Sequence, residues 1–182
     1  MRVIAGTARG RRLETLPGEE VTRPTIERVK EAMFSSVQFM LPGARVLDPF
    51  AGSGQLGIEA LSRGARSCVF LDQSRDAVNI ITANCKTAEV FDRCRVSMGD
   101  ALSFLRTTRD TFDLIVLDPP FGHGTLAQVL PLLDGCLAPG GIVLCESETD
   151  ALLPGAAGEL QLARQYRYGK ILVTRYEKEG QV

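Results

Sequence analysis

Residues 45–57, Arg-Val-Leu-Asp-Pro-Phe-Ala-Gly-Ser-Gly-Gln-Leu-Gly, decide how the rest of this 182-residue chain is interpreted. Residues 45–47 are typical of a short buried strand, and a loop of small residues separates them from a helix expected to begin near Gln55. Glycines let such a loop turn sharply and approach a ligand closely, and the helix N-terminus adds free N–H groups. A strand, a glycine loop and a helix in this order predict the ligand site of an open α/β sheet.

The spacing of three glycines in this stretch, Gly52, Gly54 and Gly57, fits G-x-G-x-x-G. A glycine turn without a ligand would fit it too. However, Asp72 ends a second predicted strand at the spacing where an acid accepts hydrogen bonds from both hydroxyls of a ribose. Residues 45–72 therefore predict a pocket for a molecule with an adenosine-like half.

The length and composition are typical of one globular domain. Hydrophobic residues make up 45% of the chain and charged residues 24%, and 182 residues can bury a substantial core. The sequence contains no apolar run long enough to span a bilayer, and its first residues lack the apolar core of a signal peptide. We therefore expect a single domain, residues 1–182, that acts as a monomer in the cytoplasm.

The five cysteines are odd in number and form no C-x-x-C pair, and the chain has one histidine, His123. This composition favours neither a disulfide framework nor a zinc site, so no metal is expected. His123 follows Gly122 directly and precedes Gly124, and a histidine between two loop glycines is typical of a solvated side chain rather than of a general base.

The distribution of charge says more than its sum. The formal net charge is −1, yet Arg2, Arg9, Arg11 and Arg12 fall within the first twelve residues with no acid among them. Such a basic arm could hold a phosphate backbone on one face of the protein. A solvated hairpin with no partner explains the same pattern equally well.

The order of predicted elements defines the fold class. Residues 1–24 are expected to form a small β-hairpin extension, residues 25–43 a leading helix, and residues 44–182 an α/β core. Strands are predicted at 45–48, 68–72, 94–98, 112–117 and 141–146, with helices near 55–63, 74–88, 101–107 and 125–137. This alternation, followed by two extended runs around Gly169, predicts a mostly parallel seven-stranded sheet that ends in an antiparallel hairpin.

A second informative stretch, Asp118-Pro119-Pro120-Phe121, follows a strand of four apolar residues. The two prolines stiffen the loop, so that backbone carbonyls can point at a fixed position. The ring of Phe121 offers a stacking surface, worth about 1–3 kcal/mol per base. These residues predict a site that holds a planar base with an exocyclic amine. Acceptors in this site would bind the N–H hydrogens of the amine while its nitrogen develops positive charge. The alternative is a turn in which Phe121 packs into the core.

These motifs carry a family resemblance. The loop at residues 48–54, the acids Asp72 and Asp100, and the motif at 118–121 resemble, in this order, a Rossmann-like class I S-adenosylmethionine-dependent methyltransferase that modifies amino groups. The stretches at residues 9–13, 23–34 and 57–65 resemble, more narrowly, the RsmD family of 16S ribosomal RNA (guanine-N2) methyltransferases.

The resemblance implies a role for each matching residue. It implies that S-adenosylmethionine is held by Asp48, Phe50, Ala51, Gly52, Ser53, Gly54, Asp72, Gln73, Asp100 and Ala101. It implies that Asp118, Pro119, Pro120 and Phe121 hold the target guanine as catalytic residues. It implies that 16S rRNA contacts Arg9, Arg11, Arg12, Arg23 and Thr25. The ribose acid of the family is more often Glu, to which the shorter Asp72 is chemically equivalent. Pro49 and Gln55 also depart from the family pattern, and they affect the rim of the cofactor loop.

Other functions fit parts of the pattern. The same chemistry could act on adenine in DNA, although the chain has no separate target-recognition domain. G-x-G-x-x-G with an acid also fits an NAD-dependent oxidoreductase, but the motif at 118–121 is then unexplained. A non-catalytic RNA-binding module is a further alternative, but it would not need both the glycine loop at 48–54 and the loop at 118–121. The substrate could be naked 16S rRNA or a small-subunit particle, and the short basic arm favours the particle, which would present the base.

Overall fold

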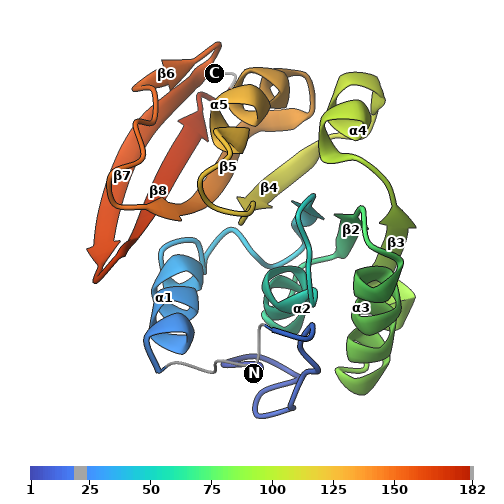
Figure 1. The fold of residues 1–182 in the computed structure, drawn as a ribbon. Coiled ribbons are helices and arrows are strands. Elements are labelled where there is room, and N and C mark those ends of the chain that lie inside the picture. The colour runs from blue at the N-terminus through green and yellow to red at the C-terminus, as the bar shows by residue number, and fades with distance from the viewer. Residues whose placement is uncertain (19–23, 181–182) are drawn as a thin grey trace.

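The computed structural model describes residues 1–18 and 24–180, which form one mixed β-sheet with helices on both faces (Figure 1). The strands are β1 (Arg45–Asp48), β2 (Ser67–Asp72), β3 (Cys94–Met98), β4 (Phe112–Leu117), β5 (Leu137–Glu148), β6 (Ala156–Ala157), β7 (Leu160–Tyr168) and β8 (Ile171–Lys178). The helices are α1 (Pro24–Ser35), α2 (Gln55–Ser62), α3 (Arg75–Thr87), α4 (Ala101–Thr107) and α5 (Thr125–Val129), with 3₁₀ turns η1 (Phe91–Arg93) and η2 (Leu130–Gly135).

The strand order is β3-β2-β1-β4-β5-β8-β7-β6. Strands β1 to β5 pair in parallel, and β8, β7 and β6 continue the sheet antiparallel. This confirms the predicted mostly parallel sheet with a terminal antiparallel hairpin. The predicted number of seven strands was too low, because Ala156 and Ala157 pair with Gln161 and Leu160 as an eighth, short strand.

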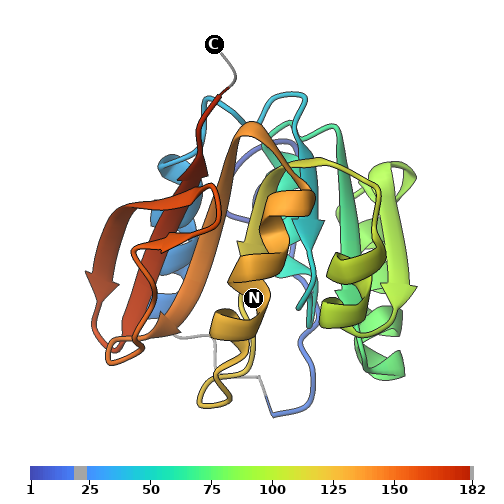
Figure 2. The ribbon, with the colours of Figure 1, turned by 90° about the horizontal axis from the view of Figure 1, so that it is seen from above.

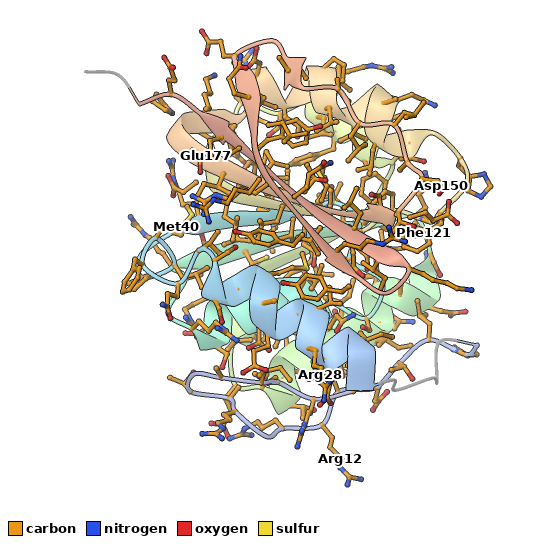
Figure 3. The ribbon with its side chains drawn as sticks, turned by 90° about the vertical axis from the view of Figure 1, so that its left-hand side faces the viewer. Arg12, Arg28, Met40, Phe121, Asp150 and Glu177 are labelled. Atoms are coloured by element: carbon orange, nitrogen blue, oxygen red, sulfur yellow. The ribbon has the colours of Figure 1, made fainter. Side chains whose placement is uncertain are left out.

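The core lies in two layers, one on each face of the sheet. Helices α1, α2 and α3 cover one face and α4 and α5 the other, as Figures 1 and 2 show from perpendicular directions. Within β4, Leu114 and Val116 belong to the first layer, whereas Ile115 and Leu117 belong to the second. Both faces are therefore buried, which explains why these strands are continuously apolar in sequence. Side chains fill the space between the sheet and the helices that cover it (Figure 3).

The third glycine of the loop motif allows α2 to pack directly on β2. A Cβ atom at Gly57 would lie 2.2 Å from a ring carbon of Phe70 and 2.7 Å from the sulfur of Cys68. Any side chain at Gly57 would push α2 away from the sheet, and with it the loop that precedes the helix. Gly57 is thus required by packing rather than by its backbone angles.

Several element boundaries differ from prediction. Helix α1 ends at Ser35 instead of residue 43, and the chain continues in tight turns in which Val37 donates to the carbonyl of Phe34. The helix predicted over 125–137 becomes α5 and the 3₁₀ turn η2, because Pro131 has no N–H to continue the α-helix. Strand β5 begins at Leu137 instead of residue 141 and ends at Glu148 instead of residue 146.

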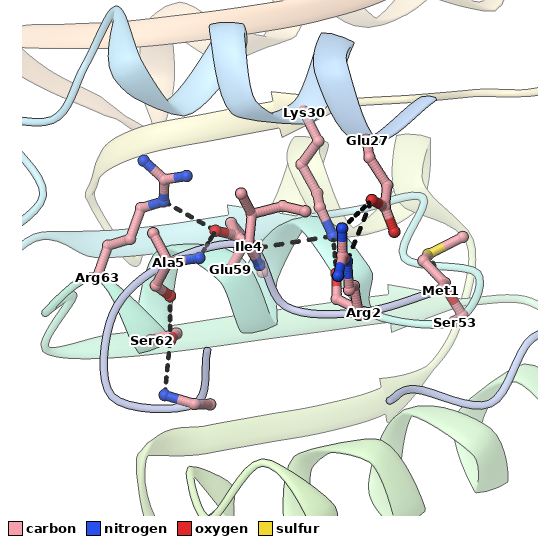
Figure 4. A network of polar contacts seen from close by, with 12 residues as sticks. Met1, Arg2, Ile4, Ala5, Glu27, Lys30, Ser53, Glu59, Ser62 and Arg63 are labelled. Carbon is pink, nitrogen blue, oxygen red and sulfur yellow. Dashed lines mark hydrogen bonds and ion pairs between the residues drawn. The ribbon is translucent and has the colours of Figure 1, made fainter. Parts of the chain in front are cut away.

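The N-terminal arm, residues 1–18, follows a hairpin path but forms a single β-bridge, between Arg2 and Arg12, instead of two paired strands. Its main partner is Glu59 of α2, which is fully buried. The Glu59 carboxylate accepts the backbone N–H groups of Ile4 at 2.9 Å and Ala5 at 3.0 Å (Figure 4). Because α2 supplies hydrogen bonds that a partner strand would otherwise supply, the arm is held without regular pairing.

Two cations complete this network. Lys30 of α1 is also buried, with its Nζ 3.5 Å from the Glu59 carboxylate and donating to the carbonyl of Arg2 at 2.7 Å. Arg63 donates to the same carboxylate at 2.9 Å. Burial lowers the pKa of Lys30, and Glu59 opposes that shift. Glu59 therefore joins the arm, α1 and α2 through one buried carboxylate (Figure 4).

A second buried side chain, Asn84 of α3, joins the arm to the glycine loop. Its amide oxygen accepts the N–H of Glu14 at 2.8 Å, and its amide nitrogen donates to the carbonyls of Glu14 at 2.9 Å and Ser53 at 2.8 Å. This places the end of the arm beside the loop, with Leu16 on the wall of the cavity described below.

Candidate active site

Acidic residues stand at the carboxyl ends of three neighbouring parallel strands. Asp48 ends β1, Asp72 ends β2, and Asp118 directly follows β4. In the strand order, β2 and β3 lie on one side of β1, and β4 and β5 lie on the other. The direction in which successive strands are added to the sheet therefore reverses between β1 and β4. Ligands of open α/β sheets bind outside the carboxyl ends of the strands at such a reversal.

The glycine loop is fixed by Asp72. Gly52 donates its N–H to one carboxylate oxygen of Asp72 at 3.0 Å, and Ser74 donates to the other at 2.9 Å. Gly54 adopts φ +78°, a left-handed conformation that suits glycine, and caps the start of α2. A carboxylate has about four acceptor positions, so Asp72 keeps capacity for two hydroxyl donors while it anchors the loop.

Asp48 is a buried acid with an unused acceptor. Its side chain is 1% exposed, and one oxygen accepts the N–H of Gly57 at 3.1 Å. The other oxygen has no hydrogen-bond partner among the described residues. Burial raises the pKa of Asp48 to about 7, with a smaller contribution from Asp118, and the Gly57 hydrogen bond opposes the shift. A cationic donor at this oxygen would stabilise the ionised form.

Asp100 caps helix α4. One carboxylate oxygen accepts the N–H of Ser103 at 2.8 Å, and the other accepts the side-chain amide of Gln73 at 2.8 Å. These hydrogen bonds, the Ser103 N–H first, lower the pKa of Asp100. The pairing explains why Gln73 and Asp100, which follow neighbouring strands, stand together at this edge.

One cavity of about 620 Å³ brings together most of the predicted site. From the predicted cofactor set its wall includes Phe50, Gly52, Asp72, Gln73, Asp100 and Ala101, and from the predicted base holder it includes Asp118, Pro119, Pro120 and Phe121. Four predicted cofactor residues stand behind the wall: Asp48, Ala51, Ser53 and Gly54. Ala51 illustrates why, since its N–H is bonded to the carbonyl of Leu71 inside the sheet.

The loop at residues 118–121 separates this cavity from a second one of about 320 Å³. Phe121 is 44% exposed, which excludes the alternative that its ring packs into the core. Its ring is instead available at the junction of the two cavities. A planar group could stack there while its edge reaches Asp118.

Sequence reasoning missed part of the wall. Leu16, Gly99, Leu102, Thr125 and Gln128 also line the first cavity, as do Pro49 and the exposed His123. The residues around Leu16 did not indicate that it lines a cavity, because its position depends on Asn84, which is far away in the sequence. A further acid, Glu146, lines the second cavity, and the sequence did contain an indication of it, since Glu146 comes directly after the apolar run 142–145 within β5.

The predicted RNA-binding residues do not share one environment. Arg9 and Arg12 are exposed. Arg11 is bound to α3 and the residues after it, with an ion pair to Glu89 at 2.8 Å and a hydrogen bond to the carbonyl of Thr87 at 2.7 Å. Thr25 lies in the first turn of α1, and Arg23 lies outside the described residues.

The fold and the site define a class I methyltransferase. The model of the family described as Conserved hypothetical protein 95 matches residues 1–177, and the chain belongs to this family, the RsmD family. It is 40% identical to "Putative rRNA methyltransferase YlbH" of Bacillus subtilis (strain 168), over 99% of this chain and all of that protein.

Other similar proteins agree with this assignment. "Ribosomal RNA small subunit methyltransferase D" of Escherichia coli (strain K12) is 34% identical over all of this chain and 91% of that protein. The solved structure of "Putative methyltransferase yhhF" from Escherichia coli superposes with a TM-score of 0.85 at 33% identity, covering 100% of this chain and 99% of that one. The resemblance drawn from the motifs is thereby confirmed, and the oxidoreductase alternative is set aside. Among the described residues, no helix is long and apolar enough to cross a membrane.

Proposed function

We propose that this protein transfers a methyl group from S-adenosylmethionine to the exocyclic N2 amine of a guanine in 16S rRNA. One observation carries the proposal: a single cavity extends from the acids Asp72 and Asp100 to the stiff loop at 118–121. A nucleoside cofactor at the acidic end and a base at the loop would therefore share one space, which transfer between them requires.

The chain's own groups fit this cofactor. Asp72 has acceptor capacity for the ribose hydroxyls, and Asp100 and the N–H of Ala101 stand at the adenine end. The unused oxygen of buried Asp48 suits the cationic amino group of the methionine part, through direct or water-mediated contact. When bound, S-adenosylmethionine supplies an electrophilic methyl group.

The loop at 118–121 prepares the nitrogen that is methylated. The lone pair of an exocyclic amine is delocalised into the base, so this amine is a poor nucleophile. Acceptors at Asp118 and at the Pro119 carbonyl would hold its N–H groups and stabilise the positive charge that develops on nitrogen. Phe121 would hold the ring by stacking.

The relatives' names and the arm support a choice of substrate. Exposed Arg9 and Arg12 can meet a phosphate backbone, but two arginines provide little capacity to read sequence. We therefore infer a small-subunit particle, in which ribosomal proteins present the base, as the substrate. We also propose that the chain acts as a monomer in the cytoplasm. Methylation of adenine in DNA uses the same amine chemistry and is the main competing proposal.

A transfer assay separates these substrates. Labelled S-adenosylmethionine would be offered with small subunits that lack the modification, with naked 16S rRNA and with duplex DNA, and the labelled nucleoside would be identified after digestion. We expect N2-methylguanosine from the subunits and much less from naked RNA. Methyladenine from DNA as the main product would replace the proposal with its competitor.

Replacing Asp72 with alanine should weaken binding of S-adenosylmethionine by about 1.5–3 kcal/mol, as for hydrogen bonds to a charged group. The loss includes the ribose contacts and the loosening of the Gly52 loop. Calorimetric titration measures it directly. Asp76→Ala, which removes an exposed acid outside the cavity, is the matched control, and equal affinities for the two variants would argue against the ribose role.

If the exposed arginines of the arm contact RNA phosphates, replacing them should weaken RNA binding and reduce its dependence on salt concentration. The double variant Arg9→Gln/Arg12→Gln should bind small subunits more weakly. The slope of log K plotted against log salt concentration should also become smaller in magnitude by about 1–2, because each lost phosphate contact contributes about 0.7–0.9 to that slope. Arg109→Gln, exposed on the loop between α4 and β4, should change neither value. Arg11→Gln should mainly affect stability, because Arg11 is bound to Glu89. An unchanged slope in the double variant would leave the arm as a solvated hairpin.

A further inference from the structure

Of the acids that line the second cavity, Glu146, Glu148 and Asp150, Glu146 lies nearest in the sheet to the loop at 118–121. The cavity, about 320 Å³ in volume, is lined on one side by the loop at 119–127 and on the other by residues 146–148 and 150–153. Its volume is at the lower end of the range for small-ligand sites, which suits a single base better than a whole nucleotide cofactor. Because the two cavities share residues 119–121, a base held at this loop could keep its amine beside Asp118 in the first cavity while another part of its edge reaches into the second.

The sheet register places Glu146 next to Asp118. Strands β4 and β5 are parallel neighbours in which Leu117 is paired with Cys145, so Asp118 and Glu146 are the next two positions along the chains. Adjacent strands lie about 4.8 Å apart, and residues at paired positions point to the same side of the sheet. Two carboxyl groups therefore stand side by side where the cavities meet.

The surroundings of Glu146 leave its carboxyl group available to a ligand. Glu146 is half-buried and lines the second cavity. Burial, together with the neighbouring Asp118, raises the pKa of Glu146 to about 8. A ligand that brings two N–H donors would relieve both the desolvation and the repulsion.

We propose that Glu146 determines the base specificity of the site by accepting the N1–H and one N2–H hydrogen of guanine. An ionised carboxylate only accepts hydrogen bonds, and guanine presents two adjacent donors on its Watson–Crick edge. Adenine presents an acceptor at N1 instead, which the carboxylate would repel. The remaining N2–H would be shared between Asp118 and the Pro119 carbonyl. This inference rests on the proposed function and adds the group that distinguishes guanine from other amines.

The test uses a base that differs at the N1 edge while keeping the amine. 2-Aminopurine retains the 2-amine of guanine but has an acceptor at N1. Small subunits would be reconstituted with guanine or 2-aminopurine at the nucleotide that the wild-type enzyme methylates, and kcat/KM would be measured for both. Glu146→Gln replaces two acceptors with one acceptor and one donor, which matches 2-aminopurine.

We expect the wild-type enzyme to favour guanine by about 10–100-fold, the usual value of one bidentate base contact. Glu146→Gln should lower kcat/KM for guanine and raise it for 2-aminopurine, so that the ratio falls by at least tenfold. The control, Glu177→Gln, makes the same substitution on β8, far from Phe121 and Asp150 (Figure 3), and should leave the ratio unchanged.

The outcomes separate the two proposals. An unchanged ratio in Glu146→Gln overturns the role of Glu146 while leaving guanine methylation intact. Equal losses on both bases, with a lower Tm, would indicate a structural role and also overturn it. Absence of N2-methylguanosine with the wild-type enzyme would refute the proposed function itself, and the inference with it.

Discussion

Replacing Asp118 with alanine is expected to lower methyl transfer by about two to three orders of magnitude while binding of S-adenosylmethionine stays within about twofold. Removing one preorganised group that stabilises developing charge typically costs this much in kcat. In the proposed arrangement the acceptor serves the target base, whereas Asp72 and Asp100, across the cavity, would hold the cofactor. Single-turnover transfer and calorimetry on the same preparation measure the two effects separately.

Asp118→Asn is the matched variant for this experiment. Its amide oxygen preserves one acceptor toward the amine, so it should retain far more activity than alanine. It also removes a charge beside Glu146 and Asp48, whose pKa values Asp118 raises. Near-normal turnover by the alanine variant would exclude the proposed role of the side chain, and equal losses in both variants would assign that role to the charge.

Replacing Glu59 with alanine is expected to cost about 3–5 kcal/mol of the free energy of unfolding, the usual effect of removing one partner of a buried charge pair. Lys30 would stay buried with the carbonyl of Arg2 as its hydrogen-bond acceptor, and the N–H groups of Ile4 and Ala5 would lose their acceptor. Urea denaturation, monitored by circular dichroism, measures this change in the free energy of unfolding. The urea concentration at the midpoint should fall, while m, the dependence of that free energy on urea concentration, should stay constant.

Two comparisons make this stability test specific. The double variant Glu59→Gln/Lys30→Met should recover part of the loss, because it removes the buried charges together. Glu27→Ala removes the partner of exposed Arg2 from the same region and should cost only about 0–1 kcal/mol. A loss for Glu59→Ala as small as that for Glu27→Ala would mean that water replaces the buried network.

Local patterns were sufficient to predict much of the fold. The predicted bounds of β3, α4 and β4 agree with the structure, because apolar strands and a helix begun by the Asp100 cap depend on neighbouring residues. The glycine loop and the loop at 118–121 were predicted for the same reason. Within the candidate site, the residues that follow strands were the ones that could be located from sequence, since parallel strands end at a common edge.

The remaining features depend on contacts between distant residues. The arm is held by Glu59 and Asn84, more than fifty residues away, so the sequence of the arm suggested a hairpin that its hydrogen bonds do not complete. Arg11 resembled its basic neighbours in sequence but is bound to Glu89. Glu146 gained its significance only from the register that sets it beside Asp118.

The side-chain amide of Asn84 has a thermodynamic consequence. It bonds at once to Glu14 of the arm that is proposed to meet RNA and to Ser53 of the loop that is proposed to meet the cofactor. Any ligand that shifts one of these segments must work against the other through the same three hydrogen bonds. By linkage, the factor by which RNA changes the affinity for cofactor equals the factor by which cofactor changes the affinity for RNA, so the two binding events are coupled with no preferred direction.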